Sequence, residues 1–428
     1  MAEIHHALLS NSTEKAPSQS QPTTTDTEDP NLVDFNGPND PLDPQNFPPW
    51  QKWLYANIIG WLLLVVTFAA SVFSAATGTT ATEFHVSPQV TTLRTALFIA
   101  GFAAGPLLFG PLSELYGRKR PLMAGIAGCY FADFFDPVQR GLALAVFSGT
   151  TLVGPIIGPI VGGFISESSL GWRWTSWITM IMAATAGLIR LVFLPETYAP
   201  LLLQRKAAQL RLETRHWALH AKLDESPITL SSITTRYLSR PLLMLTHEPI
   251  LQLITAYMTF IYGFIYLLFE AYPISFIEER HYTLGIGAWP FLSIGLGAQI
   301  IFTAHIRPEE RLYPMIPGSV LLPVGILLFA WTSFPSLSIW DQVVAGVPLG
   351  AGIQSIVAAG FTMFAMPMYH RLGACISLTL LIVNLLTSQV QWASSLLSFF
   401  GVAFIPIPII FYIYGERIRK PSRYSPTL

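Results

Sequence analysis

Charged residues are scarce in this chain. Asp, Glu, Lys and Arg make up 11% of its 428 residues, against about 25% in an average soluble protein. Hydrophobic residues make up 52%, so the chain cannot cover a water-facing surface with polar groups. This composition excludes an ordinary soluble domain and predicts an all-α integral membrane protein. The net charge of −1 gives no reason to expect a nucleic-acid partner.

Cysteine and clustered histidine are also lacking. The two cysteines, Cys129 and Cys375, cannot build a disulfide framework. The histidines lie in the first fifty residues, in loops or near the ends of expected spans, and no HExxH pattern occurs. His216 and His220 could share a helix face, but we interpret them as a solvated pair. The sequence therefore predicts no metal site, no cofactor and no enzyme activity at membrane depth.

The first fifty residues lack an apolar run. They hold one lysine and no arginine, and they are rich in Ser, Thr, Pro, Asn and Asp. Such a segment buries too little apolar surface to fold, and it contains no cleavable signal peptide. We predict a disordered cytoplasmic tail over residues 1–50.

Long uncharged runs follow the tail and predict membrane-spanning helices of about 20 residues each. We expect about ten spans in two halves, residues 51–194 and 249–415. The polar segment 195–248 separates the halves, and residues 416–428 form a second tail. Pro121 to Ala132 is too short to cross, because twelve residues of helix reach only about 18 Å. The expected spans are 52–83, 95–113, 141–166, 174–194, 249–269, 281–305, 312–340, 342–370 and two within 372–415.

Basic residues gather in segments that an even span count places on one side. These segments are 118–120, 195–248, 307–311 and the C-terminal tail. Because basic loops stay on the cytoplasmic side, both termini and the central segment are predicted to be cytoplasmic. Leu203, Ala207 and Leu210 suggest an amphipathic helix lying on the membrane. Arg190, near the end of its span, is expected to extend to the interface.

The stretch from Gly110 to Arg120 ends a predicted span. Gly117 suits a left-handed helix end, and the basic residues after it sit well against the exposed carbonyls. Glu114 can pair with Arg118 four residues later. The residues could be a plain stop-transfer flank, or a charge lock that acts in gating. The residues of this motif are Gly110, Glu114, Gly117, Arg118 and Lys119.

Glycine recurs every four residues in the span 141–166. This spacing puts the glycines on one helix face and lets another helix approach closely. The neighbouring prolines remove backbone hydrogen bonds and can bend the helix. Ordinary tight packing and a specific functional motif are both compatible with the pattern. The motif residues are Gly149, Gly154, Pro155, Gly158, Pro159, Gly162 and Gly163.

Both stretches resemble motifs of one family. The first resembles the loop after the second span of major facilitator transporters. The second resembles the fifth-span motif of the proton-driven antiporters in that family, of the fungal multidrug, polyamine and mycotoxin type. The resemblance implies two helical bundles around a central cavity, and a monomer in the plasma membrane. It also implies export of a small organic molecule (a drug, polyamine or fungal secondary metabolite) in exchange for protons.

The chain departs from that family in length. The family has twelve spans, whereas the third and fourth are compressed here into residues 121–133, and the arginine of the fourth span has no counterpart. A truncated, non-transporting relative is therefore the alternative, and a sugar importer shares the fold.

Glu270 follows twenty-one uncharged residues and precedes a further apolar run. It could be an interfacial acid in contact with water. It could also be a carboxyl whose charged form is disfavoured by partial desolvation, able to carry a proton or hold a cationic substrate. We predict Glu270 as a candidate proton or substrate site.

Overall fold

The computed structural model describes residues 29–37, 39–87, 90–91, 93–101, 104–105, 109, 119, 134–135, 137–225, 249–300, 314–369 and 390–410. Expectations for Gly110, Glu114, Gly117, Arg118, Pro121–Ala132, residues 226–248 and the tail 416–428 fall outside these residues. In the part that is described, the regular elements are helices, and a single parallel bridge joins Leu32 to His220.

The expected spans 52–83, 141–166, 174–194, 249–269, 312–340 and 342–370 appear as helices with shifted ends, whereas 281–305 contains two short helices and much of 95–113 and 372–415 lies outside the described residues. Six helices within the described residues are long and apolar enough to cross a membrane, and a shorter apolar helix covers Leu397–Ile410. The main elements are α2 (Pro49–Ser71), η2 (Ser74–Ala76), α3 (Thr77–Phe84), α6 (Pro137–Glu167), α7 (Arg173–Phe193), α8 (Ala199–Thr214), α11 (Pro249–Pro273), η5 (Ile274–Glu278), α12 (Leu284–Gly287), α13 (Phe291–Ile300), α14 (Met315–Thr332), α15 (Ile339–Tyr369) and α16 (Val390–Phe404). Helix α16 begins at Val390, within the segment 372–415 where two spans were expected.

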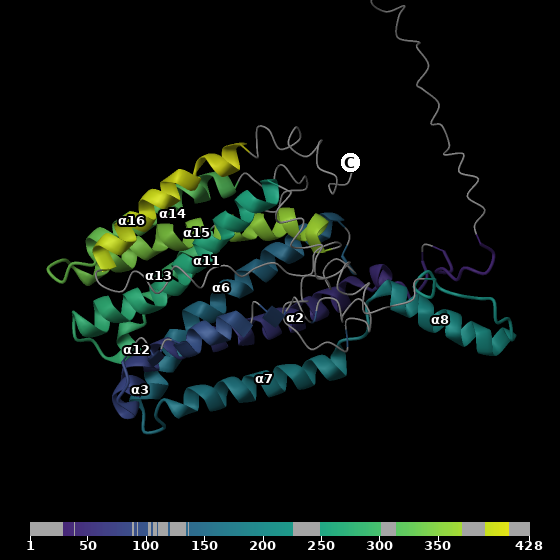
Figure 1. Ribbon diagram of the computed structural model, residues 1–428, viewed down its shortest axis with the longest axis horizontal. Coiled ribbons are helices and arrows are strands. Elements are labelled where there is room, and N and C mark those ends of the chain that lie inside the picture. Colours follow the sequence, from purple (N-terminus) through teal and green to yellow (C-terminus); the bar gives the residue numbers. More distant parts are fainter. Residues whose placement is uncertain are drawn as a thin grey trace, which may run out of the picture.

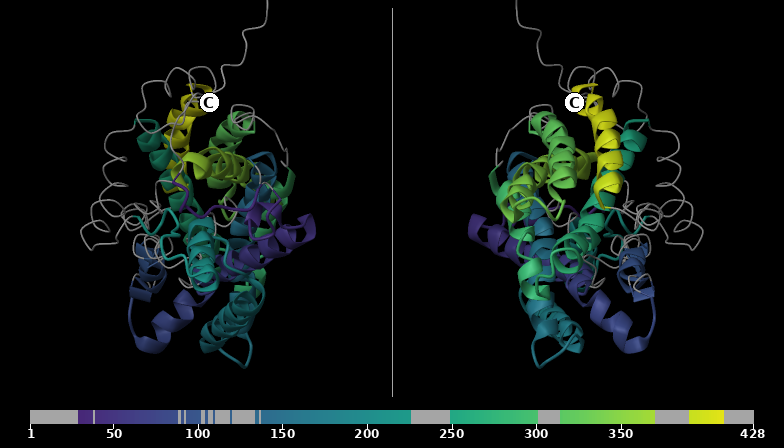
Figure 2. Two further views of the ribbon diagram at one scale, coloured as in Figure 1. Left: turned by 90° about the vertical axis from the view of Figure 1, so that its right-hand side faces the viewer. Right: turned by 90° about the vertical axis from the view of Figure 1, so that its left-hand side faces the viewer.

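The helices form two groups that follow the chain order. In Figure 1 and Figure 2 the N-terminal helices α2, α6 and α7 lie on one side, and α13 to α16 lie on the other. Helices α6 and α15, each of 31 residues, are the longest described elements, one in each group. At 1.5 Å per residue each reaches about 46 Å, more than the ~30 Å apolar core of a bilayer.

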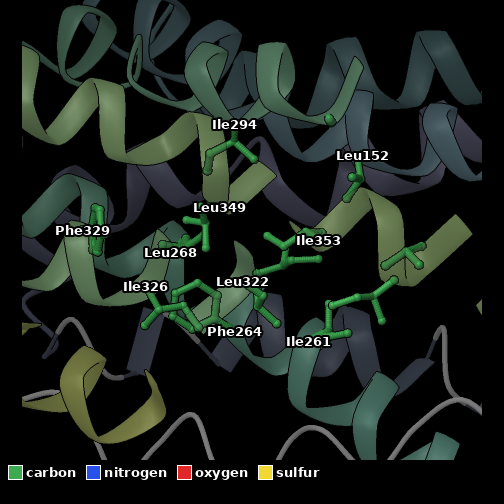
Figure 3. Close-up of a cluster of buried hydrophobic side chains, with 14 of the residues drawn as sticks. Leu152, Ile261, Phe264, Leu268, Ile294, Leu322, Ile326, Phe329, Leu349 and Ile353 are labelled. Carbon is green, nitrogen blue, oxygen red and sulfur yellow. The ribbon is translucent and has the colours of Figure 1, made fainter. Parts of the chain in front are cut away.

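The largest buried cluster belongs mainly to the second group and includes one face of α6. Figure 3 shows Leu152 of α6 near Ile353 of α15, together with side chains of α11, α13 and α14. Ile156 of α6 also belongs to this cluster, and Ile160 packs against it. Since residues 152, 156 and 160 share one helix face, this face of α6 joins the two groups.

Residues 29–48 pack against the segment after α7, although a disordered tail was expected over 1–50. Val33 is buried with Ala207 of α8 and Ala221, and Leu203 and Leu210 pack against them. The amphipathic helix expected around Ala207 is therefore confirmed as α8. Its apolar face is covered by the tail, however, whereas a membrane surface had been expected there.

A buried ion pair anchors the same segment. The Lys206 ammonium lies 3.1 Å from an Asp40 carboxylate oxygen, with the two side chains 12% and 3% exposed. It also donates to the carbonyl of Asp34 at 2.9 Å and to Asn36 Oδ1 at 3.1 Å. Backbone N–H groups of Asn36 and Leu42 donate to the Asp40 carboxylate, and these bonds, then Lys206, hold the pKa of Asp40 below its ordinary value.

His220 adds a pH-dependent contact to this docked segment. Its backbone makes two hydrogen bonds with the tail. The His220 carbonyl accepts from the Val33 N–H at 2.8 Å, and the His220 N–H donates to the Asn31 carbonyl at 3.0 Å. Its ring lies near the carboxylates of Asp29 and Glu225, 3.7 and 3.4 Å away. The bond between the ring and the Ala218 carbonyl, and then these carboxylates, raise the pKa of His220 above its ordinary value.

We expect the docking of residues 29–37 to weaken as pH rises through the raised pKa of His220. Because the folded pKa is raised, the stabilisation is complete below about pH 6.5 and lost above the folded value. Hydrogen exchange at Val33, corrected for the intrinsic pH dependence, should be slower at about pH 6 than at about pH 8. His220→Gln should remove this difference. An equal difference in the variant would show that another group is responsible.

Candidate functional site

The glycine motif of α6 forms the seat of α2. Cβ atoms built at Gly154 and Gly158 would collide with Thr67 and Ser71 on the last two turns of α2, and a Cβ at Gly162 would collide with the carbonyl of Val72, which directly follows α2. The Ser71 hydroxyl donates to the Gly154 carbonyl at 3.2 Å, which is a contact that only close helix packing allows. The predicted glycine face is thus a packing face in this structure. Pro155 and Pro159 lie inside α6, and the helix continues past both.

The last glycine of the motif faces the second group of helices. A Cβ at Gly163 would lie 2.5 Å from the Leu284 carbonyl oxygen, at the start of α12. Conversely, a Cβ at Gly285 would lie 2.6 Å from the Phe164 ring. The motif therefore seats α2 on one face of α6 and α12 on another.

The first glycine of the motif also faces the second group. A Cβ at Gly149 would lie 3.8 Å from the side-chain nitrogen of Gln354, on α15. That nitrogen donates to the Ser148 hydroxyl of α6 at 3.2 Å, and both side chains are buried. Gln354 was not among the functional residues predicted from the sequence. The feature that could have marked it is an amide side chain within a mostly apolar run.

Helix α15 repeats the packing of α6. Gly346 and Gly350 lie four residues apart in α15, and Cβ atoms there would collide with Ser293 and the Ile294 carbonyl of α13. A Cβ at Gly352 would lie 2.6 Å from the Leu322 nitrogen of α14. Each group of helices is thus built around one long, glycine-lined helix.

Lys119 is the described residue of the predicted charge lock. Its N–H donates to a carboxylate oxygen of Glu196 at 3.0 Å, and its carbonyl accepts from the Arg190 guanidinium at 2.8 Å. The other Glu196 oxygen accepts from the N–H groups of Thr197 and Tyr198, both at 3.1 Å. Glu196 is 8% exposed. Arg190 near the end of α7 and Glu196 just beyond it therefore both hydrogen-bond to the backbone of Lys119 in the predicted charge lock.

Arg190 does not reach out to an interface as expected. It is 4% exposed and lies against Lys119. The position of Arg190 near the end of its span predicted an interfacial arginine. A buried guanidinium needs acceptors, and the backbone carbonyl of Lys119 is one of them. The burial of Arg190 depends on Lys119, which is distant in the sequence, so the sequence alone could not predict it.

The opposite end of the first group carries a second polar cluster. Glu83 accepts from the Trp172 indole and from Arg173, both at 2.6 Å. The Trp172 ring also meets Phe73 and Phe84 edge-on. These contacts tie the end of α3 to the start of α7.

Glu270 lies in α11 between Phe269 and Ala271, which are both buried. Its side chain is outside the described part of the structure. Its role stays a prediction. Among the described residues, no group of three His, Cys, Asp or Glu side chains could hold a metal ion.

These features define a multi-pass helical membrane protein with two helix groups joined along α6. The model of the Major Facilitator Superfamily matches residues 126–388, and the chain belongs to this family. It is 44% identical to the citrinin biosynthesis cluster MFS transporter mrr1 of Monascus ruber, over 96% of this chain and 95% of that protein.

Other fungal relatives are also named as MFS transporters. The ascochitine biosynthesis cluster MFS transporter of Didymella fabae is 41% identical, over 94% of this chain and 90% of that protein. The cercosporin MFS transporter CTB4 of Cercospora nicotianae is 35% identical, over 93% and 90%. A solved structure, the human organic anion transporter MFSD10 (TETRAN), has a TM-score of 0.49 and 16% identity, and covers 85% of this chain and 100% of that one.

The alignment with the Monascus ruber relative also bears on length. It extends over 492 positions, more than the 428 residues of this chain. An alignment longer than the chain must contain positions where the chain has no residue. The compression of the third and fourth spans into residues 121–133 stays a prediction.

Proposed function

We propose that this protein exports a small organic molecule, a fungal secondary metabolite, across a membrane in exchange for protons. The observation that carries the proposal is the double role of α6. Its glycine face seats α2 in the first group, and its other faces meet α12 and α15 in the second. A helix that joins both halves is where a rocking motion between them must be accommodated. The relatives named for citrinin, ascochitine and cercosporin clusters support the substrate class.

The test is an efflux assay with the full chain in cells that lack their own pumps. Cells expressing the chain should retain less citrinin or cercosporin than control cells, and collapse of the proton gradient should abolish the difference. Unchanged retention of every compound, with the chain present in the membrane, would refute export.

A non-transporting relative is the second candidate. The alignment that exceeds the length of the chain favours it, because aligned positions without a residue in this chain could belong to the transport path. Export that depends on the proton gradient would exclude this candidate.

We also propose that both termini and residues 195–248 are cytoplasmic, in the plasma membrane, in a protein that acts as a monomer. The orientation is supported by the basic segments 118–120, 195–248, 307–311 and the C-terminal tail, which an even span count places on the same side of the membrane. Labelling from outside intact cells should miss a cysteine at the exposed Ala208 and reach it after permeabilisation, in a chain with Cys129 and Cys375 replaced by serine. A cysteine at Ala207, which is fully buried, serves as the control. Labelling at position 208 without permeabilisation would overturn the orientation.

A further inference from the structure

The contact between α6 and α15 includes one hydrogen-bonded pair of side chains. On α6, Ser148, Leu152 and Ile156 are spaced four residues apart on one helix face and are among the residues that meet the second group. Ser148 is the polar one of these three. It accepts from Gln354, whose neighbours in α15 are the buried Ile353 and Ser355. Figure 3 shows Leu152 of α6 and Ile353 of α15. A primary amide thus lies at membrane depth, between the two halves.

One of the two polar atoms of the Gln354 amide has no hydrogen-bond partner among the described residues. Gln354 is 2% exposed, and within the described residues its carbonyl oxygen Oε1 has no hydrogen-bond partner. Leaving a buried acceptor unpaired costs about 1–3 kcal/mol. If the amide were flipped, the nitrogen would be the unpaired atom, so the deficit does not depend on its orientation.

A second glutamine on the same helix shows the contrast. Gln342 is fully buried, accepts from the Ser275 hydroxyl at 3.1 Å and donates to the Ser333 hydroxyl at 2.9 Å. Both ends of that amide are paired, as expected for a side chain whose role is structural. Gln354 lacks the second partner, and a structural role alone does not account for that.

We propose that Gln354 is a contact for the transported molecule, whose hydroxyl group donates to Oε1 when the halves separate. The inference rests on the proposed function. In this conformation Ser148 satisfies the amide nitrogen, and Gly149, without a side chain, leaves room for the amide against α6. Because the surroundings are apolar, a neutral hydroxyl is a less costly partner than a charged group.

The test compares binding of umbelliferone, which carries one phenolic hydroxyl, with binding of its methyl ether. A neutral hydrogen bond contributes ~0.5–1.5 kcal/mol, so the purified full chain should bind umbelliferone about 2–10-fold more tightly. Gln354→Leu should bind both compounds equally. Gln342→Leu is the matched control and should keep the preference.

Thermal unfolding separates binding from packing. Gln354→Leu removes an unpaired buried atom and should not lower the melting temperature. Gln342→Leu removes two buried hydrogen bonds, including the acceptor of the Ser275 hydroxyl, and should lower it. Equal binding of both compounds by the parent chain, or an unchanged preference in Gln354→Leu, would overturn the inference. If export is observed alongside such a result, the proposed function stands and only the role of Gln354 falls. If no compound is exported, the proposed function itself fails.

Discussion

Replacing Gly162 by alanine is expected to destabilise the protein by about 1–3 kcal/mol, the usual cost of overpacking. The new Cβ would collide with the carbonyl of Val72, the C-cap residue of α2, and a backbone carbonyl cannot rotate away as a side chain can. In an open helix position the same change would be favourable by up to about 1 kcal/mol, because alanine has the higher helix propensity. The collision should outweigh this gain and reverse its sign.

Gly187→Ala is the matched control for this change. Gly187 lies inside α7, and a Cβ there would meet nothing within 4 Å. Melting temperatures of the two purified variants should therefore move in opposite directions from that of the parent. Efflux should fall in Gly162→Ala alone, since the seat of α2 on α6 is altered only there. A Gly162→Ala protein as stable as the parent would show that α2 and α6 are not packed this closely.

Replacing Glu270 by glutamine is expected to abolish proton-coupled efflux while leaving membrane insertion intact. Glutamine has nearly the same shape but cannot take up and release a proton. The position follows the buried Phe269 and precedes the buried Ala271 and Tyr272 of α11. A carboxyl in a largely apolar helix is a functional-site hypothesis by default.

The measurement is export from inside-out membrane vesicles at several imposed pH gradients. Glu279→Gln is the control, because Glu279 lies exposed just beyond η5 and its loss should change nothing. If Glu270→Gln exports like the parent, with the same pH dependence, then Glu270 is an interfacial acid and coupling lies elsewhere.

The helical membrane class and most described spans followed from the sequence. Uncharged runs of about 20 residues have few alternatives to a spanning helix, because no water satisfies their backbone groups in the bilayer. The glycine spacing in α6 likewise predicted a close packing face, since a four-residue repeat falls on one side of any helix. The family could be identified from local motifs, because these depend on residues near one another in the chain.

Only the tertiary structure decided what each face meets. The periodicity of α8 identified its apolar face, but Val33, far away in the sequence, covers that face in place of a membrane. Arg190 lies in an ordinary apolar run, and its burial against Lys119 depends on the approach of a separate segment. Gln354 is a candidate substrate contact only because of the packing of α6 against α15. Whether a side-chain atom lacks a hydrogen-bond partner depends on its packed neighbours and not on the residue type.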